Sequence, residues 1–198
     1  MQRSWVASCH SFAPVHITMV KAQDGGAPEQ DRVYVDVDGE TRRVAVHVVH
    51  DLPHLVVESF FGIADGLWGE LTAGLHTDAN FAATARDARR QKQGRIVSGQ
   101  ASGARTDEWL SDGHRIAKIV TNAVVNRWGD GPDTPAGVRS RLIREDSEPI
   151  RELLARVDDE TIAAAIQAVS HLGRRWAGTP PGDSIRLTWP LDRSSGQS

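Results

Sequence analysis

Two short stretches near the N-terminus alternate apolar and polar residues. Val33, Val35 and Val37 recur at every second position, and Val44, Val46 and Val48 do the same a few residues later. Asp38-Gly39 lies between the two runs, and this dipeptide favours the positive φ angles that a tight hairpin turn needs. The pattern therefore predicts a β-hairpin over residues 32–49.

Two further strands are indicated at the ends of the folded region. The run VHITMVKA (15–22) is a plausible first strand, and SIRLTWPL (184–191) alternates Ile185, Leu187 and Trp189. A strand near the C-terminus needs partners for its backbone N–H and C=O groups. We therefore expect it to join the N-terminal hairpin in one antiparallel sheet.

The segments between these strands have the apolar spacing and capping residues of helices. A helix is expected from Asp51, where the aspartate can cap the first turn, and glycines at 62, 66 and 69 predict that it is kinked or restarted. Further helices are predicted from near Thr106, over 112–128, over 134–144, over 147–157 and from 158 to about 176. This order of elements predicts an α+β fold, with a small antiparallel sheet (the N-terminal hairpin plus the C-terminal strand) packed on about five helices.

The length of 198 residues suits one domain. Residues 14–191 are expected to form it, between a flexible N-terminus (1–13) and a disordered tail (192–198). Residues 86–105 are rich in Arg, Gly, Ser and Gln and poor in apolar groups, which is typical of a mobile basic loop. This loop has no interleaved aromatic residues to stack on bases, so nucleic acid is an improbable partner.

Composition and missing motifs restrict the functional classes further. The net charge of −3 gives no general attraction to nucleic acid or anionic lipid, and no apolar run approaches the length of a membrane span. The single cysteine, Cys9, suits a cytoplasmic protein, and the strong preference for arginine over lysine suggests a GC-rich bacterial genome. The chain has no phosphate-binding Gly-Lys-Ser/Thr loop, no Gly-x-Gly-x-x-Gly and no Gly-x-Ser-x-Gly elbow. Nucleotide-driven motors, ordinary nicotinamide dehydrogenases and α/β hydrolases are therefore disfavoured.

The first candidate site is the segment HDLPHLVVE, which contains His50, Asp51, His54 and Glu58. If the strand runs to residue 49, His50 lies at the bend before the helix, whereas His54 and Glu58 lie one turn apart on it. Histidines and a carboxylate at such spacing suggest a zinc or other divalent metal site, with His50, His54, Glu58 and a distant His114 as ligands, or an acid–base site. The simpler alternative is a helix cap at Asp51 and an ordinary i,i+4 pair of His54 with Glu58.

The second candidate site is a polar stripe on the predicted helix 112–128. At 100° per residue, Arg115, Lys118, Asn122 and Asn126 share one side, and the core-facing side is apolar. Asparagine is a weak helix former, so two asparagines inside a helix need a reason. The stripe could bind an anion or small polar ligand, could form a structural hydrogen-bond network, or could simply be solvated.

These observations support two functional hypotheses. The first is a bacterial, cytoplasmic binding or interaction domain without catalysis, whose partner is an unknown protein or a small polar ligand and whose cofactor is unknown. The second is a metal-dependent or acid–base enzyme that uses the HDLPHLVVE segment. The first hypothesis allows for a homodimer.

Overall fold

The structure is a computed structural model of the whole chain. It describes residues 15–23, 31–37, 39–44, 46–73, 111–127, 129, 131 and 133–191. The predicted flexible N-terminus (1–13), basic loop (86–105), helix near Thr106 and C-terminal tail (192–198) lie outside these residues or extend beyond them.

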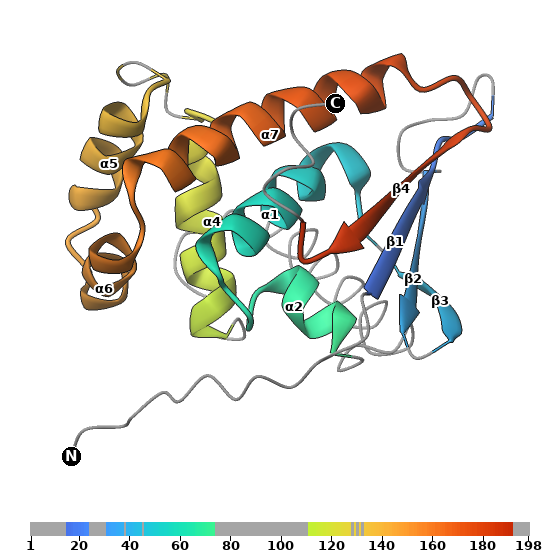
Figure 1. Cartoon of the computed structure of the whole chain (residues 1–198), viewed down its shortest axis with the longest axis horizontal. Helices are drawn as coiled ribbons and strands as arrows, with labels where there is room; N and C mark the ends of the chain where they lie inside the picture. The colour runs from blue at the N-terminus through green and yellow to red at the C-terminus, as the bar shows by residue number, and fades with distance from the viewer. Residues whose placement is uncertain are drawn as a thin grey trace, which may run out of the picture.

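The strands form a four-stranded antiparallel sheet in the order β3-β2-β1-β4 (Figure 1). They are β1 (Val15–Val20), β2 (Arg32–Val37), β3 (Glu40–Val44) and β4 (Ser184–Trp189). Gly39 adopts a φ of +82° in the turn between β2 and β3, as the hairpin prediction requires. The pairing of β4 with β1 confirms that the C-terminal strand joins the N-terminal hairpin.

Alternate residues of the sheet build one buried face. Ile17 lies between Val35 and Leu187 across the strands, and the neighbouring row places Met19 between Val33 and Ile185. All of these side chains are buried and belong to one hydrophobic core. The helices cover this face, so the α+β prediction is confirmed.

Among the described residues there are six helices. They are α1 (Val48–Phe61), α2 (Leu67–Thr72), α4 (Asp112–Val124), α5 (Pro135–Ile143), α6 (Glu148–Arg156) and α7 (Asp159–Gly178). Helix α1 is central: it contacts α2, α4 and α7, whereas α5 and α6 lie at the end of the molecule away from the sheet (Figure 1). Thr134 and Asp158, where two of the predicted helices begin, are the N-caps of α5 and α7, since their side chains accept hydrogen bonds from the N–H groups of Gly137 and Thr161.

The structure corrects the predicted junction between the hairpin and the first helix. Strand β3 ends at Val44, and α1 begins at Val48, three residues before the predicted start at Asp51. Val48 is buried, but on the helix, where it shares the core with Leu52 and Leu55. The alternation of valines misleads because a residue that follows a strand at even spacing can also face the core from the first turn of a helix.

The predicted interruption of the first helix is confirmed. Helix α1 ends at Phe61, where Gly62 takes a left-handed conformation with φ of +66°, and α2 restarts after Gly66. In the part of the chain that the structure describes, no helix has the length and apolar character needed to cross a membrane.

Candidate functional site

The start of α1 is organised by Asp51. Its Oδ2 accepts a hydrogen bond from the backbone N–H of His47, 2.7 Å away, and its Oδ1 lies 2.6 Å from Nδ1 of His50. Asp51 therefore stabilises the first turn from within the helix, in the manner of the acidic residue of a capping box. Because α1 begins at Val48, His50 belongs to that first turn and does not precede the helix as predicted.

His50 and His54 consequently lie one turn apart on one helical face. Their rings stack, with centroids 5.6 Å apart and an angle of 27° between the planes. His50 is exposed, whereas His54 is mostly buried and its Nδ1 lies 3.4 Å from the Thr121 hydroxyl of α4. Burial lowers the pKa of His54 to about 4, an effect that the Asp51 carboxylate opposes and that nearby cationic groups reinforce. At neutral pH, His54 is a neutral imidazole.

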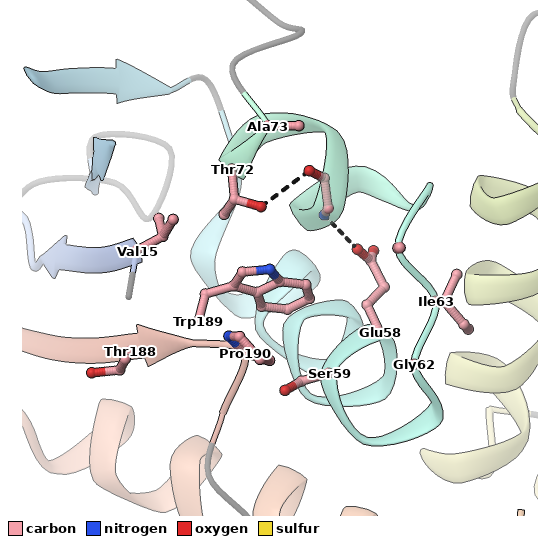
Figure 2. Close-up of a pocket in the computed structure, with 12 residues that line it drawn as sticks. Val15, Glu58, Ser59, Gly62, Ile63, Thr72, Ala73, Thr188, Trp189 and Pro190 are labelled. Atoms are coloured by element: carbon pink, nitrogen blue, oxygen red, sulfur yellow. Dashed lines mark hydrogen bonds between the residues drawn. The ribbon is translucent and has the colours of Figure 1, made fainter. Parts of the chain in front are cut away.

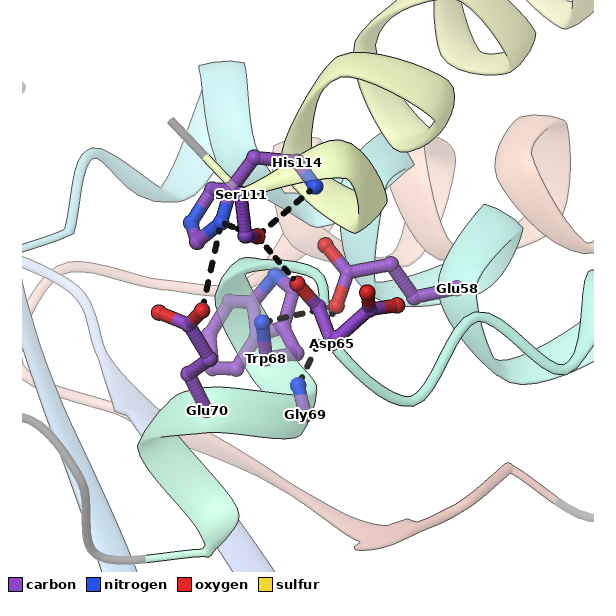
Figure 3. Close-up of polar contacts among 7 residues, drawn as sticks. All are labelled: Glu58, Asp65, Trp68, Gly69, Glu70, Ser111 and His114. Carbon is purple, nitrogen blue, oxygen red and sulfur yellow. Dashed lines mark hydrogen bonds and ion pairs between the residues drawn. The ribbon is translucent and has the colours of Figure 1, made fainter. Parts of the chain in front are cut away.

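Glu58, one turn further along α1, is a buried carboxyl group that caps a different helix. Its side chain is 1% exposed, and Oε2 accepts hydrogen bonds from the N–H groups of Trp68 (2.7 Å) and Gly69 (3.1 Å) in the first turn of α2 (Figure 3). Gly66 makes room for it, because a Cβ atom there would stand 2.4 Å from Glu58 Cδ. The predicted i,i+4 pair with His54 is not formed, since the two side chains have different partners.

The protonation of Glu58 is set by two opposed effects. Burial raises its pKa, and the hydrogen bonds from the backbone of Gly69, Trp68 and Leu67 lower it. Burial prevails, and the pKa rises from an ordinary 4.5 to about 8. Among the described residues, Oε1 has no hydrogen-bond partner. Since Oε2 already accepts two hydrogen bonds, the carboxyl proton belongs on Oε1.

A polar cluster fastens the start of α4 to the α1–α2 connection (Figure 3). Ser111 caps α4 by accepting from the N–H of His114, and its hydroxyl donates to the backbone oxygen of Asp65 at 2.7 Å. Gly113 is buried against Asp65, where a Cβ atom would lie 2.1 Å from the carboxylate. These contacts hold α4 beside α1.

The cluster contains a serine, a histidine and a glutamate, but not in the arrangement of a catalytic triad. In a triad the serine and the acid bind opposite nitrogens of the imidazole. Here the Ser111 hydroxyl (2.8 Å) and the Glu70 carboxylate (3.6 Å) both approach Nδ1 of His114. Ser111 therefore acts as a cap and a tether, and this geometry does not activate it as a nucleophile.

The end of α4 explains one asparagine of the predicted stripe. The helix ends at Val124, and Asn126 follows it with a φ of +50°, a left-handed conformation that asparagine tolerates. The N–H of Arg127 bonds to the Asn122 carbonyl at 3.0 Å, and the N–H of Asn126 to the Ala123 carbonyl at 3.4 Å, as in a Schellman motif. Asn126 is thus a structural residue beyond the helix, and not a member of its interior as predicted.

The two candidate segments meet in one pocket of about 450 Å³, which we call the histidine pocket. Its polar lining comes from α1, from α4 and from the turn after α4. The lining residues are His50, Asp51, His54, Glu58, Leu67, His114, Ala117, Lys118, Asn122 and Arg127.

Most of the predicted site residues line this pocket, and two do not. Arg115 is exposed on α4 and does not line the histidine pocket, and Asn126 has the structural role described above. Arg127 lines the pocket but was absent from the predicted stripe, because a helix continued to residue 128 would carry it to another face. The signal that could have found it is Asn126, as a residue suited to end a helix.

The geometry gives no support to a metal centre among the predicted ligands. A zinc site needs three or four ligand atoms around one point. His50, His54, Glu58 and His114 all border the pocket, but no group of three among the His, Cys, Asp and Glu side chains in the described ranges could hold a metal ion. The Glu58 carboxyl group is directed instead to the backbone of α2. The metal assignment stays a prediction from the sequence alone.

Comparisons with known proteins identify no relative of this chain. No family model matches the chain, and neither curated proteins nor solved structures contain a significant match.

Proposed function

We propose that the chain is a ligand-binding domain whose histidine pocket takes a small molecule bearing a carboxylate or phosphate group. The observation that carries this proposal is the convergence of two polar segments, more than fifty residues apart in the sequence, on one pocket. Its volume of about 450 Å³ lies within the range usual for small-molecule sites.

The charges around the pocket favour an anion. Lys118 and Arg127 bring two basic side chains to the pocket, whereas its acidic lining residues are Asp51 and Glu58, and Glu58 is mostly protonated at neutral pH because its pKa is about 8. Asp51 is also occupied by the backbone of His47 and the ring of His50. The Asn122 amide and the histidine N–H groups supply further donors suited to oxyanions.

Isothermal titration with inorganic phosphate and with succinate tests the proposal. Lys118→Ala should weaken binding about fivefold, because removal of one partly solvated charge at contact distance costs about 1 kcal/mol. Arg115→Ala is the matched control, since it removes the same charge from the same helix outside the pocket. An equal effect of both variants, or no saturable binding of either anion, contradicts the proposal.

A second candidate is acid–base catalysis on the bound molecule. The observation that favours it is the opposite displacement of two pKa values in one pocket: His54 is neutral above about pH 4, and Glu58 keeps its proton up to about pH 8. Such a pair can remove a proton from a carbon beside a carbonyl group and protonate the carbonyl oxygen, giving an enol.

Exchange of hydrogen in deuterated water tests this reaction. If His54 takes the proton from carbon 3 of 2-oxobutyrate, reversal of the step introduces deuterium there, and mass spectrometry detects it. His54→Gln should then exchange no faster than buffer. Exchange that is equal in the parent protein and in buffer rejects this candidate and leaves ligand binding standing.

A further inference from the structure

A second cavity of about 620 Å³ is lined in part by the α1–α2 connection, and we call it the apolar pocket. Figure 2 draws its lining, which comes from α1, α2 and the adjoining ends of β1 and β4. Most of the wall is apolar: Val15, Ile63, Ala64, Ala73, Trp189 and Pro190. The half-buried Trp189 brings an indole ring, which suits contact with a flat aromatic ligand.

In the described part of the chain, the buried polar side-chain atoms that line this pocket are hydrogen-bonded within the protein, except for one carboxyl oxygen. The Ser59 hydroxyl accepts from the N–H of Leu191, and the Thr72 hydroxyl donates to the carbonyls of Trp68 and Gly69. Glu58 also lines the pocket (Figure 2), and its Oε1 is the carboxyl oxygen that lacks a hydrogen-bond partner among the described residues. A buried polar atom without a partner is destabilising, and a ligand that supplies the partner recovers part of the lost energy.

We propose that the apolar pocket binds a small aromatic alcohol, whose rings occupy the apolar wall and whose hydroxyl group hydrogen-bonds to Glu58 Oε1. A hydroxyl group both donates and accepts, so it can pair with this oxygen whether or not the oxygen carries a proton. Two fused rings fit within a cavity of this volume, and their burial supplies the main part of the affinity. This site shares only Glu58 with the histidine pocket and does not depend on the function proposed for that pocket.

The experiment compares 2-naphthol with naphthalene, which has the same ring system without the hydroxyl group. Titrations of the full chain are followed by NMR at the methyl groups of Val15 and Ile63 and at the Trp189 indole N–H. We expect saturable shifts at these groups, with 2-naphthol bound at least about tenfold more tightly than naphthalene, because only the alcohol pairs the buried oxygen.

Variants separate this site from the histidine pocket. Ala64→Leu combined with Ala73→Leu adds side chains at two exposed positions of the apolar pocket and should abolish 2-naphthol binding without unfolding the protein. Lys118→Ala changes the other pocket and should leave 2-naphthol binding unchanged. Each variant is accepted only if its circular dichroism and unfolding midpoint match the folded parent. Absence of saturable shifts, equal affinity for the two compounds, or binding that survives the double substitution overturns the proposal.

Discussion

Replacement of the buried Glu58 by glutamine should change how the stability of the protein depends on pH. Glutamine keeps the shape of the side chain, and its amide oxygen can still accept from the N–H groups of Trp68 and Gly69 that cap α2. It cannot ionise. The comparison of Glu58→Gln with the parent therefore isolates the proton on Glu58.

The sign and size of the effect follow from the pKa of Glu58, which rises from 4.5 to about 8 on folding. The folded state binds this proton more tightly than the unfolded state does, so the stability it contributes is complete below the unfolded pKa and is lost as the pH rises through the folded one. One pKa unit corresponds to about 1.4 kcal/mol, so the parent should lose about 4 kcal/mol from this group between about pH 5 and about pH 9. The glutamine variant should not lose it.

Urea unfolding at intervals across this pH range measures the difference in unfolding free energy between variant and parent. Other titrating groups contribute equally to both proteins and cancel. The two unpaired amide hydrogens that glutamine introduces add a penalty that is independent of pH and leaves the slope intact. The difference should rise by about 4 kcal/mol in favour of the variant from the acidic to the alkaline end. Parallel stability curves for the two proteins would contradict the raised pKa of Glu58, because they would mean that the helix N–H groups hold Glu58 ionised despite its burial.

Three further changes test the structural account. Gly66→Ala should lower the unfolding free energy by about 2 kcal/mol or more, because its methyl group would lie 2.4–2.8 Å from the carboxyl group of Glu58. Gly173→Ala, at an open position of α7, should raise the unfolding free energy by about 0.5–1 kcal/mol, and equal changes for the two variants in urea unfolding would be inconsistent with a tight approach at α2. Arg141→Met should lower the unfolding free energy by about 2–3 kcal/mol, because the buried Nε of Arg141 donates a hydrogen bond to the Ala123 carbonyl in the last turn of α4 at 2.9 Å. Arg144→Met, at an exposed position of the same segment, should change it by no more than about 0.5 kcal/mol, and similar urea midpoints for the two variants would disprove the role of that hydrogen bond. The parent should lose about 2 kcal/mol of unfolding free energy between about pH 7 and about pH 5, because the unfolded His54 takes up a proton below its pKa of 6.5 whereas the folded His54, with a pKa of about 4, does not, and His54→Gln should remove this loss. Urea unfolding measures it, and an equal loss of stability in acid for the variant would contradict the burial of this ring.

Sequence patterns correctly predicted those elements that are determined by residues close together in the chain. Asp38-Gly39 marks the hairpin, and the side chains of Thr134 and Asp158 cap α5 and α7 at the predicted positions. The first helix was placed three residues late because valines at alternate positions fit a strand as well as the join between a strand and a helix. Here the hydrogen bond that the His47 backbone N–H donates to the Asp51 carboxylate favours the helix.

The candidate site depended on contacts that sequence spacing does not contain. Both segments were identified, but their meeting in one pocket follows from the packing of α4 on α1. The partner of Glu58 lies ten residues away across a turn, so the carboxylate resembled half of an i,i+4 pair. Arg127 was missed because the left-handed Asn126 ends the helix and redirects the chain.

The proposed anion site requires residues 50–58 and 114–127 to form a single binding pocket. Its most direct test is a titration of ¹⁵N-labelled protein with inorganic phosphate, followed by NMR at constant ionic strength. Amide signals of the residues in both segments that line the pocket should shift together and give one shared dissociation constant, whereas the signal of Arg115, which does not line the pocket, should stay unchanged. Saturation of one segment alone, or shifts that follow ionic strength across the whole surface, would contradict it.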